Sequence, residues 1–135
     1  MVIIEVLGLA GSSKKGGPIA LIRLKLHEHP APPHHEIRQK SVLDSVGSVV
    51  GMVANLYVDE DSRQLRFVDV LTSDFLDLQR HHHPVPVEVV SLEDPGSITL
   101  RVNQETVESA PDFPNPHVVP DEEYKRTIRE HYGYS

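Results

Sequence analysis

The sequence predicts a mainly β protein, built as a small β-barrel with a strand-containing arm before it and a tail of short helices after it. Three observations predict this fold. Apolar and polar residues alternate in several short segments, turn residues recur after roughly every ten positions, and helical spacing is found only near the C-terminal end. The strand–helix–strand spacing of a parallel sheet is absent from the sequence.

Length and charge limit the classes of protein to consider. The 135 residues, 39% of them hydrophobic, are enough for one domain with a modest core. Residues 1–40 carry a net charge of +3 and residues 41–135 carry −10, so the body of the chain would repel a nucleic acid. No apolar run approaches the ~18 residues of a membrane span, and Val2–Ala10 lacks the basic start of a signal peptide. We therefore expect no membrane span of its own. The chain has no cysteine, which excludes disulfides and thiolate chemistry.

Residues 1–40 read as an arm that ends in a proline-rich linker. From position 18 to position 29, apolar and polar residues alternate with a period of two, which predicts a half-buried strand. Its apolar side is formed by Ile22, Leu24 and Leu26. We expect these three side chains to dock on a partner protein or on a neighbouring barrel.

Residues 41–103 read as the barrel. Between positions 50 and 58 the even-numbered residues are all apolar, which predicts a strand with its core face on Val50, Met52, Ala54, Leu56 and Val58. The alternation in the next strand slips between Phe67 and Val68, which predicts a β-bulge. Two prolines in the stretch from 84 to 90 predict an edge strand or the start of a strand there, and positions 97–102 predict another strand.

Residues 104–135 read as a helical tail. Asn103 can cap a short helix, and Asp121 can cap a last helix that runs to His131 and ends before Gly133. The last helix carries an apolar stripe of Tyr124, Ile128 and Tyr132. Because a helix of about eleven residues is marginal in water, we expect this stripe to pack on the barrel or on a partner.

Five segments in this order resemble the PRC-barrel family. They are the hairpin from Gly47 to Glu60, the strand Arg66–Val70, the loop Asp74–Leu78, the strand Val85–Val90, and a tail with Ala-Pro followed by a helix ending in Tyr-Gly. The resemblance covers roughly residues 41–134 and is closest to the cytoplasmic domain of the photosynthetic reaction-centre H subunit and to stand-alone PRC proteins. It departs from the family pattern at His82, His83 and Pro84, where bulky apolar residues are usual.

The resemblance implies an adaptor and not an enzyme. The first function that the resemblance implies is that of a structural subunit on the cytoplasmic face of a larger membrane assembly, peripheral to the inner membrane. Its partner there is a membrane-embedded photosynthetic complex, which it stabilises and helps to supply with protons. Two alternatives stay open: a stand-alone homo-oligomeric PRC protein of stress or regulatory type, and a ribosome-assembly or RNA-linked adaptor. The −10 charge of residues 41–135 disfavours the last of these.

The nine histidines are the main candidate chemistry. We expect His81, His82 and His83 to lie near Asp74 and Asp77 as a proton-exchanging surface, where the carboxylates would raise the histidine pKa values. The pair His27 and His29 could face one way on a strand, but the sequence supplies no closed set of metal ligands. The glycine-rich stretch from 8 to 16 does not match a phosphate-binding loop. We therefore predict no catalytic residue, no cofactor and no metal site.

Overall fold

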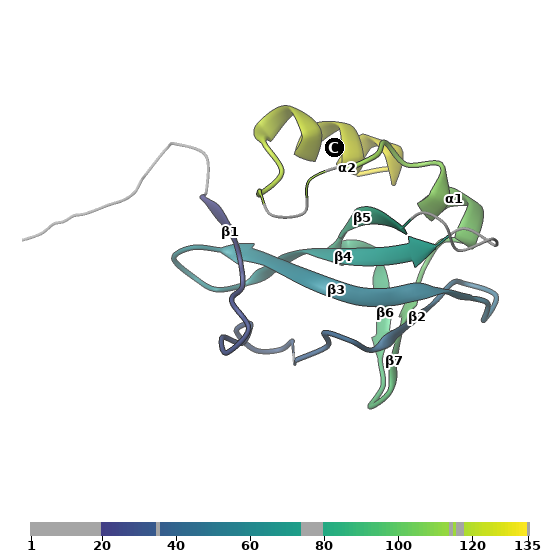
Figure 1. Ribbon diagram of the computed structural model, residues 1–135, viewed down its shortest axis with the longest axis horizontal. Coiled ribbons are helices and arrows are strands. Elements are labelled where there is room, and N and C mark those ends of the chain that lie inside the picture. The colour runs from purple at the N-terminus through teal and green to yellow at the C-terminus, as the bar shows by residue number, and fades with distance from the viewer. Residues whose placement is uncertain (1–19, 35, 74–79, 114, 116–117, 135) are drawn as a thin grey trace, which may run out of the picture.

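A computed structural model describes residues 20–34, 36–73, 80–113, 115 and 118–134 (Figure 1). The strands are β1 (Leu21–Arg23), β2 (Ser41–Leu43), β3 (Val49–Asp59), β4 (Leu65–Ser73), β5 (Arg80–Pro86), β6 (Val90–Glu93) and β7 (Ser97–Leu100). A 3-10 turn η1 (Val87–Val89) joins β5 to β6, and the tail contains α1 (Gln104–Glu108) and α2 (Glu122–His131). The mainly β fold with a short-helix tail is confirmed.

All seven strands belong to one sheet, with the long strand β3 at its centre. The order is β5-β4-β3-β2-β7-β6, and β1 pairs with β3 beside this path. The β2–β7 pair is parallel and the other pairs are antiparallel. Within the described residues no ladder joins β5 to β6, so the predicted barrel is not closed by hydrogen bonds; η1 bridges that side instead.

Two bulges in β3 move side chains between its faces. Val50 is the extra residue opposite β2, and Ala54 is the extra residue opposite β4. Each extra residue reverses the alternation that follows it. As a result Met52 is 39% exposed while Val53 is fully buried, so the predicted core face is wrong at Met52.

A third bulge lies in β4. The register shifts between the Tyr57–Phe67 and Val58–Leu65 pairs, which leaves Arg66 as the extra residue. The bulge predicted between Phe67 and Val68 is therefore real but lies one position earlier. It places the Arg66 side chain outside while Leu65 and Phe67 are both buried.

The edge strand β5 begins earlier than predicted. It covers Arg80–Pro86, including the three histidines, and the predicted strand residues Val87–Val89 form η1. Prolines at positions 84 and 86 are tolerated because β5 pairs with β4 on one side only in the described chain. The prediction of an edge strand here is confirmed, and its bounds are corrected.

The arm strand is shorter than predicted. β1 contains only residues 21–23, after which the Leu24 N–H donates to the carbonyl of Leu56 and the chain turns at positions 26–27. Leu24 is 4% exposed in the protein's own core, whereas Leu26 is 87% exposed. Ile22, Leu24 and Leu26 therefore do not form one face, because the strand ends before its alternation can continue.

Both helices begin at the predicted caps. The Asn103 side chain accepts the N–H of Thr106, and the Asp121 side chain accepts the N–H of Tyr124 at 2.8 Å. Gly133, with a φ of +89°, follows the C-terminal end of α2. In Figure 1, α2 lies over β4 and β5, on the opposite side from β6 and β7.

One hydrophobic core joins the three segments predicted from the sequence. Leu24 from the arm, Val85 from the sheet and Ile128 from the tail all belong to it. Ile128 is completely buried and Tyr132 is 9% exposed, so the stripe of α2 packs on the protein's own sheet.

Candidate functional site

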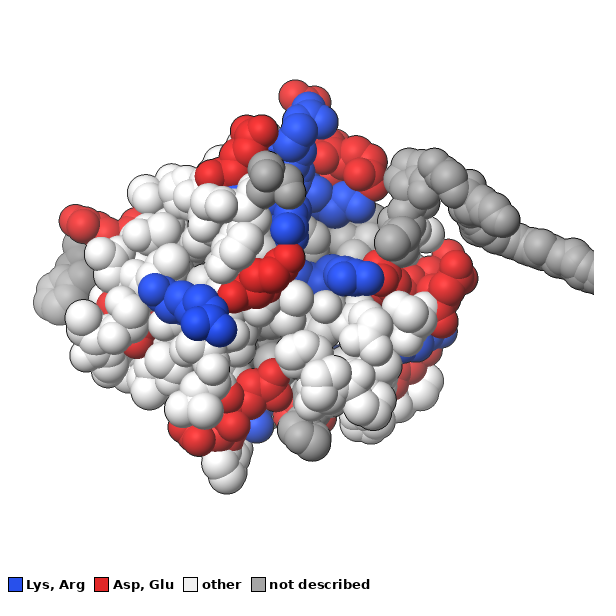
Figure 2. Space-filling view, turned by 180° about the vertical axis from the view of Figure 1, so that it is seen from behind, with Lys and Arg blue, Asp and Glu red and all other residues white. Residues whose placement is uncertain are grey.

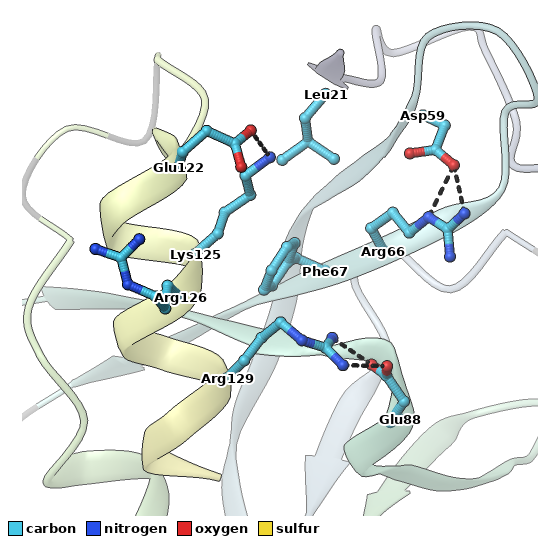
Figure 3. Close-up of a pocket in the computed structure, with 9 residues that line it drawn as sticks. All are labelled: Leu21, Asp59, Arg66, Phe67, Glu88, Glu122, Lys125, Arg126 and Arg129. Atoms are coloured by element: carbon cyan, nitrogen blue, oxygen red, sulfur yellow. Dashed lines mark hydrogen bonds and ion pairs between the residues drawn. The ribbon is translucent and has the colours of Figure 1, made fainter. Parts of the chain in front are cut away.

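A cleft of about 460 Å³ lies between α2, the β3–β4 hairpin and η1 (Figure 3). Leu21 and Phe67 give it apolar walls, and charged side chains surround them. These charged side chains come from separate elements: Asp59, Arg66, Glu88, Glu122, Lys125, Arg126 and Arg129. No local sequence pattern indicates this cleft, because its residues are brought together by the docking of the tail.

Three ion pairs line the cleft. Arg66 donates to Asp59 Oδ2 through Nε at 2.8 Å and lies 2.6 Å from it through Nη2. Arg129 contacts both carboxylate oxygens of Glu88, at 3.1 and 2.9 Å. The third pair joins Lys125 to Glu122 at 2.6 Å, one turn apart on α2.

Of the three pairs, Arg129–Glu88 attaches α2 to η1, whereas Arg66–Asp59 lies within the β3–β4 hairpin and Lys125–Glu122 lies within α2. Burial alone would raise the pKa of Glu88, but its hydrogen bonds with Arg129 lower it below the ordinary value. Arg126 makes no ion pair within the described part of the chain, and in Figure 3 its guanidinium points away from the cleft. The charges that face the cleft are therefore already neutralised by one another, and Figure 2 shows the same mixing of acidic and basic side chains along the edge where α2 lies.

A buried polar cluster lies on β3, β4 and β5. The Asp69 side chain is fully buried, and its Oδ2 accepts from the Asn55 amide at 2.8 Å and from His82 Nδ1 at 2.7 Å. Among the described residues three buried polar atoms lack a hydrogen-bond partner: Asp69 Oδ1, His83 Nδ1 and the Tyr132 hydroxyl. Such groups cost stability, and one of the three, Asp69 Oδ1, belongs to this cluster.

Aromatic rings lie beside this cluster. Tyr57 meets Phe113 edge to face at 6.3 Å, and Phe113 stacks on Tyr124 at 5.1 Å. Burial, followed by the nearby charge of Asp69, raises the pKa of Tyr57. Burial also raises the pKa of Tyr124, whose hydroxyl donates to the Pro111 carbonyl at 2.9 Å. Both phenols are therefore neutral at physiological pH, and the rings form an apolar contact between the tail and the sheet.

The predicted proton-exchanging surface is divided by the structure. His82 bonds to Asp69 and His81 lies 3.9 Å from Asp112, while His83 is only 5% exposed. Burial lowers the pKa of His83 below its usual value, and the charge of His81 lowers it further, which corrects the expected rise. The predicted partners Asp74 and Asp77 lie outside the described residues.

The arm loop is held by an arginine that the sequence did not reveal. Arg38 donates to the backbone carbonyls of Leu24, Lys25 and Glu28. It also pairs with Glu36, whose pKa this contact lowers to about 2. Arg38 thus fixes the loop whose tip carries the exposed Leu26.

Cations flank this tip. Arg23 and Lys25 are both exposed, and together with Arg38 they line a small hollow beside Leu26 of about 340 Å³. Of the six residues predicted to dock on a partner, Leu26 is the most accessible. Leu24, Ile128 and Tyr132 are buried in the core, and Ile22 and Tyr124 are partly buried against it.

Asp44 is a second structural residue that local sequence patterns did not single out. Its side chain accepts the backbone N–H groups of Val46, Ser48 and Gln104 at 3.0, 2.8 and 2.9 Å. Burial would raise the pKa of Asp44, but these hydrogen bonds outweigh it and lower the pKa. Asp44 thereby ties the β2–β3 turn to the first residue of α1.

A model of the PRC-barrel domain matches residues 33–106 of this chain, which is more than half of its 135 residues. The chain belongs to the PRC-barrel family. The matched range begins in the linker of the arm and reaches into α1, so it includes Arg38, Asp44 and Asp69. A search of curated proteins found no match to this PRC-barrel protein.

Within the described ranges, no three side chains of the metal-binding types converge on one point. No helix in the described part of the PRC-barrel protein has the length and hydrophobicity to cross a membrane.

Proposed function

We propose that this PRC-barrel protein is a non-catalytic adaptor, a structural subunit that seats on the cytoplasmic face of a larger membrane assembly. The observation that carries the proposal is the ordered arm loop with an exposed apolar tip. Arg38 donates to three backbone carbonyls of this loop, and the Leu26 side chain at its tip is 87% exposed. Because the loop is already ordered, docking through Leu26 costs little further conformational entropy. The resemblance to the reaction-centre H subunit supports the choice of a membrane assembly as partner.

The distribution of charge also supports the arm loop around Leu26 as the docking surface. Arg23 and Lys25 flank Leu26, whereas residues 41–135 carry a net charge of −10. Two exposed cations beside an apolar tip suit a protein pocket with an acidic rim. Such a contact would be weakened by salt, because the flanking charges are exposed.

The test is site-specific crosslinking in the cells that make the protein. A photoreactive residue at position 26 should give an adduct with one membrane protein, and the protein should sediment with the membrane fraction. The same residue at position 118, where Val118 is 50% exposed, serves as the matched control. The adduct from position 26 should be weakened by Lys25→Glu, and the sedimentation should be lost in the double variant Leu26→Asp, Lys25→Glu. A protein that stays in the soluble fraction and gives no adduct from position 26 would contradict the proposal.

The hydrogen bond between His82 and Asp69 supports a second role, exchange of protons with the partner. The His82 side chain is 21% exposed while Asp69 is fully buried, so the imidazole connects the interior with the surface. NMR titration of the ring in wild type and in Asp69→Asn tests this role. A His82 titration that is identical in the two proteins would show that the pair is only structural.

A further inference from the structure

The outer face of the sheet carries a continuous row of uncharged side chains across four strands. The ladder registers pair Val49 with Leu43, Leu43 with Thr99, and Thr99 with Leu92. Residues paired across strands share a face of the sheet, so all four side chains lie on one side.

A second uncharged row lies beside the first. Ser41 pairs with Met52 on one side and with Ser97 on the other. The alternate residues Val42 and Ile98 are completely buried, which makes this side of the sheet the outer one.

The two rows expose apolar surface in a chain that is otherwise rich in charge. Val49 is 65% exposed, Leu92 is 53% exposed and Met52 is 39% exposed. None of the seven residues is charged, although 24% of the chain is charged. An uncharged patch of this kind indicates an interaction surface.

We propose that this face binds the same face of a second copy of the chain. Each copy carries a net charge of −7, so two copies repel one another wherever acidic surfaces meet. Contact through an uncharged face avoids that repulsion at the centre of the interface. A two-fold axis brings the same patch from both copies together, and sheet faces can pack in this way at a separation of about 10 Å.

Other partners fit this face less well. Anionic lipid surfaces and nucleic acids are bound through lysine and arginine, and neither residue is present in the two rows. The docking of Leu26 on a membrane assembly uses a different surface, so this proposal does not depend on the proposed function.

The size of the face determines the strength of the contact. Four strands spaced about 4.8 Å apart give a patch roughly 20 Å wide. Two rows of residues on such a patch are well short of the roughly 800 Å² per partner that stable complexes bury. We therefore expect a weak, rapidly exchanging dimer that becomes populated when two copies are held near each other.

Analytical ultracentrifugation of the full chain, from about 10 µM to about 1 mM, tests the proposal in the range of weak association. Wild type should shift from monomer towards dimer across this range. Val49→Asp and Leu92→Asp should each weaken association at least tenfold, because each places a charge on the contact face, at one end of the first row. Leu26→Asp is the matched control and should associate like wild type. Circular dichroism spectra of the variants should match wild type, since the substituted side chains are exposed.

Three results would overturn the proposal. One is a wild-type protein that stays monomeric throughout the range. Another is a dimer that Leu26→Asp weakens as much as Val49→Asp does. The third is a wild-type protein that does not self-associate but loses the membrane adduct when Val49 is replaced by Asp. That result would show that the uncharged face binds the membrane protein and not a second copy. A dimer with the expected variant pattern, but with no adduct from position 26, would instead remove the proposed function and leave this inference standing.

Discussion

Replacing Ile128 by alanine tests whether the tail is a structural part of the domain. Ile128 is a residue of α2 that is fully buried, and it belongs to the same core as Val85 and Leu24. Isoleucine-to-alanine substitutions at such sites cost about 2–5 kcal/mol, from lost burial and from the cavity that remains. Because this site has no exposed fraction, we expect a loss of about 3 kcal/mol or more.

Urea denaturation measures this loss as a change in the free energy of unfolding. The adjacent Thr127 offers a matched control, because its side chain is exposed and its hydroxyl donates to the Glu123 carbonyl on the same helix. Thr127→Ala should change stability by less than about 0.5 kcal/mol. In thermal melts, Ile128→Ala should lower the Tm by about 10 °C. Equal midpoints for the two variants would refute the conclusion that the sheet needs its tail.

Two further predictions concern residues that connect loops. Asp44→Ala should lower the urea midpoint more than Ser45→Ala does, because three backbone N–H groups lose their acceptor. The folded-state pKa of Asp44 is lowered, so its contribution is present above the unfolded pKa and is lost as pH falls through the folded value. The difference in stability between wild type and Asp44→Ala should therefore shrink below about pH 4. Arg38→Gln should make cleavage after Lys25 by a lysine-specific protease at least about tenfold faster, because charged hydrogen bonds worth over about 1.5 kcal/mol hold that loop; an unchanged cleavage rate would mean that Arg38 does not order it.

The elements predicted correctly are those set by local chemistry. The sequence predicts Asn103 and Asp121 at helix N-termini because their side chains can accept backbone N–H groups, and both do so in the structure. The spacing on α2 predicts an apolar stripe, and of its residues Ile128 and Tyr132 are buried while Tyr124 is partly buried. These features depend on residues within about one helical turn of each other, so the sequence contains them directly.

The features that the sequence did not predict depend on pairing between distant residues. The alternation of β3 looked regular, yet the bulges at Val50 and Ala54 exist only relative to β2 and β4. The Arg38 contacts reach 10 to 14 positions back along the chain, and Asp44 reaches Gln104 from 60 positions away. A single sequence gives no register for such contacts, and therefore neither the Arg38 contacts nor the uncharged face could be predicted from it.

The geometry of β3 bears on whether the two proposed surfaces can act together. Leu24, at the base of the arm loop, bonds to Leu56, whereas the uncharged face includes Met52 and Val49 of the same strand. Met52 is four residues from Leu56 and Val49 is seven, which corresponds to roughly 13 Å and roughly 23 Å at about 3.3 Å per residue. A partner held by Leu26 would therefore leave Val49 and its row accessible. Two copies docked on one assembly would then meet at an effective concentration in the millimolar range, where even a weak face-to-face contact is occupied.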